Sequence, residues 1–542
     1  MFYLKEESLE WALKHLLRFS SFDGHPTPFE FSAIKHDWSN VKKHIIDTDL
    51  ESYIPSAPIL NLSQKPNKTF RVIHQLHPID AIIYTALVFE IADIIEDYRM
   101  PAKDKIACSY RISKEIDGTL FKKGGWDDFK ESTGVLAEKF KRGFVLECDI
   151  TDFYNQIYIH RLKNIISEAG GAEYEAHGTV IHDFLIKLNG KTSRGIPVGP
   201  AGSIVLAETI MSDIDQRIAR STRDFTRYVD DIYIFFDSYA DAIKTLHDLT
   251  EYLYKVHRLV LSSAKTKISA VDEFFEGFVD PEKEEESAFL ERVTEEALGE
   301  LAKKCPSVKM GYDNIEEIAV FEKAEEFRRI FEEIKKKKPY KIMADSYHKS
   351  LKKELKKDKP DYNTMKYVIR RSSQAGVRCL MPLLLQNFEK CIPIIKDYIQ
   401  YIDNFLSEAI AEEYEADFDT MLKSPYVELN LVNKWVSHLF QNRIFNDSKF
   451  DIDYGLIIEK RDKLLVAYRK HDLTFIKEYK DNIDLLGPWE KRALLLASSV
   501  LSKDELRPWL ALVKAKSNVL EKSVISLSLS KNEAMSKGHD SK

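Results

Sequence analysis

Two adjacent acids interrupt an apolar stretch of the chain. Asp230 and Asp231 lie within residues 227–236, a run that is otherwise rich in β-branched and aromatic residues. For this pair alone, a tight turn without a chemical role is the simpler interpretation, because Asp favours turns. Burying two carboxylates between strands is costly, however, unless a cation or hydrogen-bond donors compensate for their charge.

A third acid stands in a similar context. Asp149 lies near the end of the apolar run 144–150. Three carboxylates brought together would repel one another at neutral pH unless a divalent cation lay between them. Two Mg²⁺ ions about 4 Å apart are used for in-line phosphoryl transfer, where one activates the attacking hydroxyl and the other holds the leaving pyrophosphate. The acids therefore predict a two-metal site that uses Mg²⁺, with Mn²⁺ as a substitute.

The residues around these acids indicate the elements that must position them. Strands are expected at 144–150, 226–236 and 259–271, and segments with helical periodicity at 81–98 and 201–219. Strands mixed with helices in this order predict an α+β domain built on a small antiparallel sheet. In such a sheet the end of the first strand can lie beside the turn that carries the Asp pair.

The second half of the chain has a different texture. A charged stretch at 281–288 marks a domain boundary, and the residues beyond it have mostly helical patterns. These predicted helices cover residues 314–338, 367–374, 391–415, 427–444 and 487–513. They show no strict sequence period, which favours an irregular helical stack over a regular repeat. The predicted domains are therefore 1–284 and 285–530, followed by a disordered tail at 531–542.

Composition excludes several classes of protein. Apolar residues make up 44% of the chain and aromatic residues 11%, which is enough for a packed core. The sequence has no long apolar run and no secretory signal, so we expect a cytoplasmic protein without a membrane span. Its net charge of −7 argues against a broad duplex-binding surface, so any nucleic acid must be bound by local basic patches.

Four segments, taken in order, resemble the motifs of reverse transcriptases. DITDFYNQIYIHRL (149–162) resembles their first palm motif, and RYVDDIYIFF (227–236) resembles their Y-x-D-D motif. SRGIPVGPAGSIVLAETIMSDID (193–215) resembles the glycine turn and helix between them, and LVLSSAKTKI (259–268) the fourth motif. SYRI at 109–112 resembles part of the fingers. The resemblance implies right-hand polymerase fingers and palm over residues 1–284.

The resemblance also implies roles for individual residues. Asp149, Asp230 and the backbone carbonyl of Ile150 are expected to hold the metal ions, with Asp231 in support. Lys265 matches the lysine of the fourth motif and is expected to protonate the leaving pyrophosphate. A solvated lysine without a catalytic role is the equal alternative for this position.

Four further residues are expected to bind substrate. Lys68 and Arg71 lie where the family places its triphosphate-binding bases, and Gly199 lets the backbone approach the nascent base pair. Tyr154 stands five residues after the first acid, where viral RNA-dependent RNA polymerases usually carry a second acid that recognises the ribose 2′-hydroxyl. A bulky ring there favours deoxynucleotides; the alternative is that Tyr154 is a core aromatic residue.

Finer similarity points to one group within the family. The turn reads Pro-Val-Gly (197–199), whereas retroviral and intron enzymes have Pro-Gln-Gly. The form G-I-P-x-G resembles bacterial defence-associated reverse transcriptases, which include the abortive-infection enzymes. That group replaces the thumb and RNase H region with a HEAT-like helical-repeat domain, and residues 489–510 resemble a stretch that recurs in it.

The group resemblance implies a function. The leading expectation is a bacterial anti-phage DNA polymerase that joins dNTPs without a template, primed on one of its own tyrosines so that the DNA product is covalently attached. The alternative is a reverse transcriptase that copies a partner non-coding RNA. A third, less favoured interpretation is an inactive helical-repeat sensor or scaffold. The helical half is expected to support a homo-oligomer.

Overall fold

The computed structural model groups the chain into two compact units. It describes residues 1–19, 24–278, 280–304, 329, 332–442 and 452–536. The first unit comprises residues 1–61, 72–278 and 498–542, and the second comprises 62–71 and 279–497. The chain thus leaves the first unit close to the predicted boundary at 284, but it returns to that unit after residue 497, which the predicted domains do not include.

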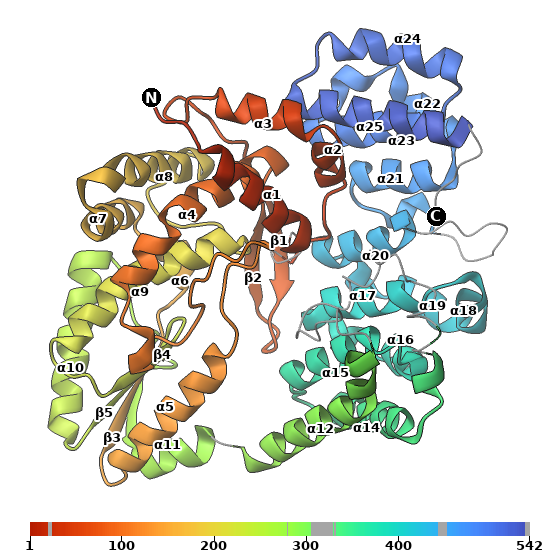
Figure 1. Cartoon of the computed structure of the whole chain (residues 1–542). Helices are drawn as coiled ribbons and strands as arrows, with labels where there is room; N and C mark the ends of the chain where they lie inside the picture. The colour runs from red at the N-terminus through yellow and green to blue at the C-terminus, as the bar shows by residue number, and fades with distance from the viewer. Residues whose placement is uncertain (20–23, 279, 305–328, 330–331, 443–451, 537–542) are drawn as a thin grey trace. The chain divides into compact units, whose positions relative to one another are not determined.

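A four-stranded antiparallel sheet lies in the first unit (Figure 1). Its strands, in spatial order, are β4 (Phe225–Tyr228), β5 (Asp231–Phe236), β3 (Phe144–Cys148) and β6 (Lys267–Ala270). The small antiparallel sheet expected from the sequence is therefore present. The strand expected over 259–271 is shorter, because the chain turns at Ser262, whose carbonyl accepts the N–H groups of Lys265 and Thr266.

Two long apolar helices form the centre of the first unit. α4 (Pro78–Tyr98) covers the predicted helix 81–98, and α9 (Ala201–Ala219) coincides with the predicted helix 201–219. They pack closely because Gly202 has no side chain: a Cβ there would lie 3.2 Å from the Tyr84 ring. The buried hydroxyls of Tyr84 and Ser203 hydrogen-bond across the same contact at 2.8 Å.

Other helices surround this centre. They are α1 (Glu6–Phe19), α2 (Glu30–His36), α3 (Trp38–Ile46), α5 (Gly125–Lys139), α6 (Phe153–Gln156), α7 (Ile159–Gly170), α8 (Glu175–Leu188), α10 (Tyr239–Tyr252) and α11 (Val271–Phe278). α10 continues into a π-helical turn, Leu253–His257. Most of the buried apolar side chains of this unit belong to one continuous core.

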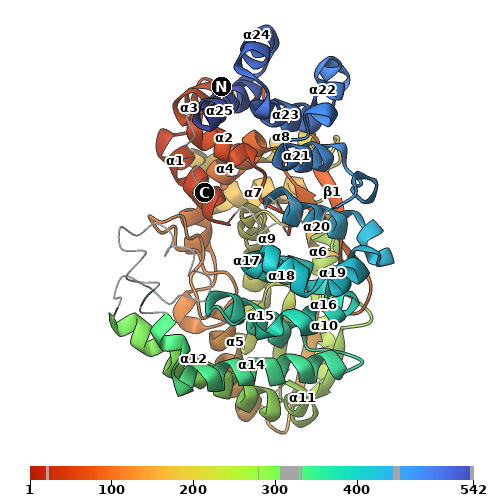
Figure 2. The ribbon, with the colours of Figure 1, turned by 90° about the vertical axis from the view of Figure 1, so that its right-hand side faces the viewer.

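The C-terminal segment completes the first unit. Its helices are α24 (Lys503–Lys514) and α25 (Val519–Ser536), and α25 lies beside α2 and α3 in both ribbon views (Figures 1 and 2). Leu520 joins the main core, and the Ser523 hydroxyl donates to Asp37 Oδ2 at 2.9 Å. Residues 531–536, predicted as the start of a disordered tail, are the last turns of α25; residues 537–542 lie outside the described part.

The described residues of the second unit are almost entirely helical. The helices are α12 (Pro281–Lys304), α14 (Lys338–Lys356), α15 (Tyr362–Gln374), α16 (Met381–Gln386), α17 (Ile395–Phe405), α18 (Glu408–Glu413), α19 (Glu415–Leu422), α20 (Asn430–Asn442), α21 (Lys460–Lys470), α22 (Leu473–Lys480) and α23 (Pro488–Ala497). Helices near in sequence pack in pairs, such as α12 with α14 and α20 with α21. Most of the predicted helix 314–338 lies outside the described residues.

Among the described strands, two form a separate small sheet where the chain passes from one unit to the other and back. β1 (Ile59–Gln64) pairs with β2 (Phe70–Gln75), and the tip of the hairpin, residues 62–71, groups with the second unit. Among the helices that the structure describes, none is both long and apolar enough to cross a membrane.

Candidate active site

The sheet register brings the first acid to the acidic pair. β3 and β5 run antiparallel, and Cys148 is the partner of Ile232. Continuing that register by one residue places Asp149 opposite Asp231. Two segments that are about eighty residues apart in sequence thus meet at one end of the sheet.

Asp230 lies in a strained turn. Tyr228 pairs with Asp231, so Val229 and Asp230 form the two-residue turn between β4 and β5. Val229 has a φ of +57°, a left-handed conformation that a β-branched residue rarely adopts and that costs roughly 1–3 kcal/mol. Its N–H donates to Ser109 Oγ at 2.9 Å, and its carbonyl accepts from Arg227 Nη1 at 2.8 Å. These bonds hold the turn in its strained form.

The carboxylates affect one another's ionisation. Partial burial and the neighbouring Asp230 and Asp149 raise the pKa of Asp231 to about 6. Lys265 Nζ donates to Asp149 Oδ1 at 2.6 Å, and this bond raises the pKa of Lys265. The structure therefore brings together all four residues that the sequence assigned to catalysis: three acids and one protonated lysine.

The direction of the Ile150 carbonyl follows from the hydrogen bonds of its two neighbours. The Asp149 carbonyl accepts from the Ser262 N–H at 2.8 Å, and the Thr151 N–H donates to the Val260 carbonyl at 2.9 Å. Carbonyls alternate in direction along an extended strand, so the Ile150 carbonyl points away from residues 260–262, toward the β5 side.

These donors fit a hard divalent cation. Carboxylate and carbonyl oxygens are the ligands that Mg²⁺ prefers, and a cation would relieve the repulsion that raises the pKa of Asp231. In the described residues, no three His, Cys, Asp or Glu side chains are arranged around one metal position. Lys265 holds one oxygen of Asp149, so a cation would have to share or displace that ammonium group.

A buried ionic network lies beneath the turn. Arg227, which is fully buried, makes two 2.8 Å bonds to Asp215 and one 2.8 Å bond to Glu208 Oε2. Arg99 Nη2 also contacts Glu208 Oε2 at 2.8 Å, and Ser109 Oγ donates to Glu208 Oε1 at 2.7 Å. Burial opposes ionisation of Glu208, but the two arginines hold its pKa below the usual range.

This network was not predicted from the sequence, although two acids in α9 indicate it. Glu208 and Asp215 are seven residues apart in a largely buried helix, which places them on the same face two turns apart. Buried acids of this kind need cationic partners. Arg227, directly before Tyr228 of the Y-x-D-D motif, is such a partner.

The glycine turn is fixed by a histidine. Gly199 has a φ of +125°, which an L-residue with a side chain rarely adopts. The Val198 N–H donates to His74 Nδ1 at 3.0 Å, and the His74 N–H donates to the Val198 carbonyl at 2.9 Å. β2 therefore determines the position of the turn that carries Gly199.

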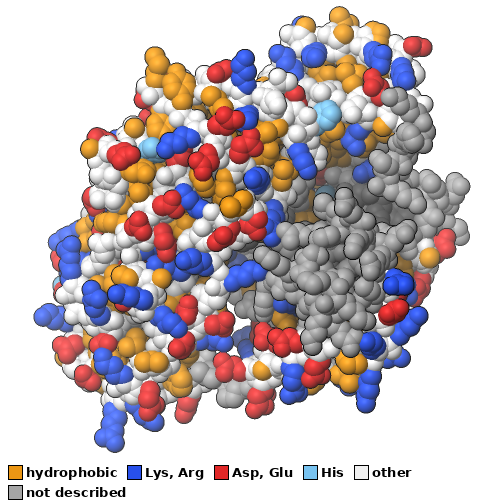
Figure 3. All heavy atoms as spheres, in the orientation of Figure 1, with side chains coloured by type: hydrophobic (Ala, Val, Ile, Leu, Met, Phe, Trp, Pro, Cys, Tyr) orange, Lys and Arg blue, Asp and Glu red, His pale blue; other side chains and the backbone are white. Residues whose placement is uncertain are grey.

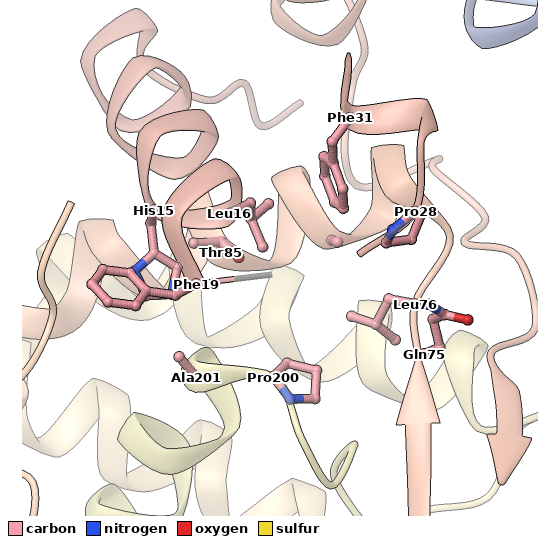
Figure 4. Close-up of a pocket in the computed structure, with 11 residues that line it drawn as sticks. His15, Leu16, Phe19, Pro28, Phe31, Gln75, Leu76, Thr85, Pro200 and Ala201 are labelled. Carbon is pink, nitrogen blue, oxygen red and sulfur yellow. The ribbon is translucent and has the colours of Figure 1, made fainter. Parts of the chain in front are cut away.

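A small cavity lies beside this turn (Figure 4). Its volume is about 30 Å³, and its walls include Gln75, Leu76, Pro200 and Ala201. On the α1 side it is bounded by His15, whose pKa burial lowers to about 4. The cavity has room for one or two water molecules but not for a nucleotide.

The other residues predicted to bind substrate are Tyr154, Lys68 and Arg71. Tyr154 is half-buried and packs against the main core, and its carbonyl accepts the Ile196 N–H at 3.0 Å. Lys68 and Arg71 belong to the hairpin tip that groups with the second unit, where Arg71 lies close enough to affect the pKa of Lys366. The roles in sugar selection and triphosphate binding stay predictions.

Comparison with known proteins adds independent information. Residues 63–314, which include all four catalytic candidates, match the family model described as reverse transcriptase (RNA-dependent DNA polymerase). Similar solved structures include the telomerase from Candida albicans in complex with a fragment of telomeric RNA (10% identity, 72% of this chain and 71% of that chain, TM-score 0.31). The apo telomerase from Candida tropicalis is another (10% identity, 91% and 73%, TM-score 0.29). No curated protein matches the chain.

Proposed function

We propose that this protein is an anti-phage DNA polymerase. It carries a reverse transcriptase domain and is therefore an RNA-directed DNA polymerase of the nucleotidyltransferase class. The enzyme polymerises dNTPs with two Mg²⁺ ions in the bacterial cytoplasm. It needs no template, starts on one of its own tyrosines and acts as a homo-oligomer. The observation that supports catalysis is the cluster of Asp149, Asp230 and Asp231 with Lys265.

The cluster has the groups that nucleotidyl transfer requires. Asp149, Asp230 and the Ile150 carbonyl would hold the ions, with Asp231 in support; bound Mg²⁺ activates the attacking hydroxyl and neutralises phosphate charge. The attacking oxygen bonds to the α-phosphorus as the α–β phosphoanhydride bond breaks, and the hydroxyl proton passes to solvent. Lys265, kept protonated by Asp149, would protonate the departing pyrophosphate.

Two observations favour synthesis without a template. The Pro-Val-Gly turn lacks the amide that retroviral and intron enzymes have near template and incoming base. The chain is also acidic overall, and on the face drawn in Figure 3 lysines and arginines are interspersed with acids. A large RNA partner would favour a more basic surface.

A growing strand needs a surface for its bases near the catalytic turn. Trp126 is half-exposed, and its ring meets that of Tyr228 edge-on, with 5.1 Å between centroids. Exposed aromatic rings stack on bases without regard to sequence, at roughly 1–3 kcal/mol per base. This pair supports a product strand that passes next to the Y-x-D-D turn.

The alternative is RNA-templated synthesis on a partner non-coding RNA. It is favoured by the lysines of α14, which include the exposed Lys341, Lys349 and Lys352. An inactive scaffold is the least favoured function, because all three acids are present and close together.

One labelling experiment separates these functions. Nuclease-treated protein is incubated with Mg²⁺ and each labelled dNTP in turn, without primer or template, and run on a denaturing protein gel. Label that migrates with the protein, and is lost about a thousandfold or more in Asp230→Asn, supports self-primed synthesis. Label that appears only when co-purified RNA is left in place supports the templated alternative. Incorporation that persists in Asp230→Asn refutes the site.

A further inference from the structure

The first unit contains a second, larger hollow. Its volume is about 360 Å³, within the usual range of about 300–1,000 Å³ for small-molecule sites. It is lined by Thr151, Gln156, Arg194, Tyr254, Arg258 and Val260. None of these residues has a role in the proposed catalysis.

The hollow lies next to the metal-binding residues along the chain. Thr151 is two residues beyond Asp149, a distance of about 7 Å in extended backbone. The Thr151 N–H donates to the Val260 carbonyl at 2.9 Å, which fixes the two walls against each other. A phosphate chain attached to a nucleotide at Asp149 could reach the hollow over this distance.

The charge of the hollow is suited to an anion. Arg194 and Arg258 give it two permanent positive charges, and none of its lining residues is an acid. Elsewhere in this unit, arginines such as Arg161 are neutralised by carboxylates. Among the described residues, Arg194 and Arg258 form no ion pair, and their side chains contact neutral groups. Arg194 Nη1 lies 3.4 Å from Gln156 Oε1, and the Arg258 guanidinium is 5.6 Å from the centre of the Tyr254 ring.

The backbone holds Arg258 in this place. Arg258 has a φ of +59° and ends the π-helical turn that follows α10. The Leu259 N–H, directly after it, donates to the Leu253 carbonyl at 3.1 Å. The arginine is thus presented by a fixed, left-handed chain reversal.

We propose that this hollow binds polyphosphate: the β- and γ-phosphates of the incoming nucleotide and then the pyrophosphate that leaves. The proposal rests on the polymerase activity, because pyrophosphate is released when the α–β bond breaks. Guanidinium groups bind phosphate oxygens through paired, charge-assisted hydrogen bonds. The residues that line the pocket do not include Lys68 or Arg71, and the pocket gives the product a place after bond cleavage.

The test compares arginine variants of the full-length chain. Arg194→Gln, Arg258→Gln and the double variant are made in the Asp230→Asn background, and binding of inorganic pyrophosphate is measured by calorimetry. The control is Arg142→Gln, because Arg142 is exposed and directly precedes Gly143 at the far end of β3 from Asp149. We expect about tenfold weaker binding for each single variant, a larger loss for the double variant and no change for the control.

Kinetics in the wild-type background test whether the pocket binds the incoming nucleotide as well as pyrophosphate. In active enzyme, the same variants should raise the KM for dNTP and weaken inhibition by pyrophosphate, with kcat lowered less than KM is raised. Unchanged pyrophosphate affinity in variants with unchanged thermal midpoints would overturn the proposal. So would a loss confined to salt-sensitive binding of single-stranded DNA. Pyrophosphate binding in the Asp230→Asn background requires no catalysis, so the calorimetry tests the pocket even if the wild-type enzyme is inactive. An inactive wild-type enzyme would refute only the proposed function.

Discussion

The carboxyl of Asp231 lies beside two other acids, which makes the site sensitive to mildly acidic pH. Its pKa of about 6 lies above the ordinary value of 3.8, so the folded protein favours the protonated form. Below pH 6 we expect incorporation at subsaturating Mg²⁺ to fall about tenfold per pH unit, because the ion must then displace the proton of Asp231. A pH–rate profile at fixed free Mg²⁺ measures this. A rate that stays flat from pH 7 to 5 would show that Asp231 need not be ionised.

The same carboxyl has a cost in stability. A raised pKa in the folded state means that ionisation destabilises the fold as the pH rises from about 4 to 6, and the penalty is fully present at pH 7. Asp231→Asn should therefore raise the free energy of unfolding at pH 7 without metal by about 1 kcal/mol, after allowance for solvent exposure. At pH 4 the two proteins should be equally stable. Denaturant titrations at both pH values check this, and a less stable variant at pH 7 would contradict the repulsion.

The Ser109 hydroxyl connects the ionic network to the strained turn. It accepts from the Val229 N–H and donates to Glu208. Ser109→Ala should lower the free energy of unfolding by about 1–3 kcal/mol and reduce kcat at least tenfold, because Val229 loses the bond that holds its left-handed backbone. Thr133→Val is the matched control: it breaks the buried 2.9 Å bond to Thr226, away from the turn. If both variants changed kcat equally, the effect of Ser109→Ala would come from a general loss of stability and not from the bond to Val229.

Among the elements of the site, the turn that carries Gly199 depends on a backbone conformation that glycine adopts easily, rather than on a side chain. Gly199→Ala places a Cβ at a φ of +125°, which should shift the turn and reduce incorporation at least tenfold, mainly through KM for dNTP. Gly277→Ala is the control, because a Cβ there meets no neighbouring atom and its φ is ordinary. Steady-state kinetics with both variants measure the difference, and an active Gly199→Ala enzyme would remove the turn from the substrate site.

Several helices and strands could be predicted from the local pattern of apolar residues. The helices at 81–98 and 201–219 were predictable because their apolar residues extend over many residues, and the strands flanking the acids because short runs rich in β-branched and aromatic residues indicate buried strands. The strand expected at 259–271 was predicted too long. Its residues are β-prone throughout, but a serine-initiated turn interrupts the pairing.

At the scale of the whole molecule, the C-terminus stabilises the N-terminal unit. Leu520 is 1% exposed in the core formed with residues from the first half of the chain. Leu520→Ala should lower the free energy of unfolding by about 2–5 kcal/mol and reduce polymerase stability on heating. Leu512→Ala on α24 is the control, since Leu512 is 75% exposed. An Leu520→Ala protein as stable as the control would show that the C-terminal helices are dispensable.

Residue types and their short spacings were enough to predict the chemistry of this protein. Three acids in two apolar runs, the order of four motifs and a glycine at the turn predict a metal-dependent polymerase, since catalysis constrains residue types at short spacing. These features need no long-range contact to be recognised.

The contacts that hold the catalytic residues in place could be seen only in the three-dimensional structure. The arginine network beneath Val229, the bond between His74 and Val198 and the return of α25 to the first unit join segments that are far apart in sequence. The arginine pocket likewise joins residues 151, 194 and 258. Such contacts depend on how buried charges and apolar faces find partners in three dimensions, and local periodicity carries no record of that choice.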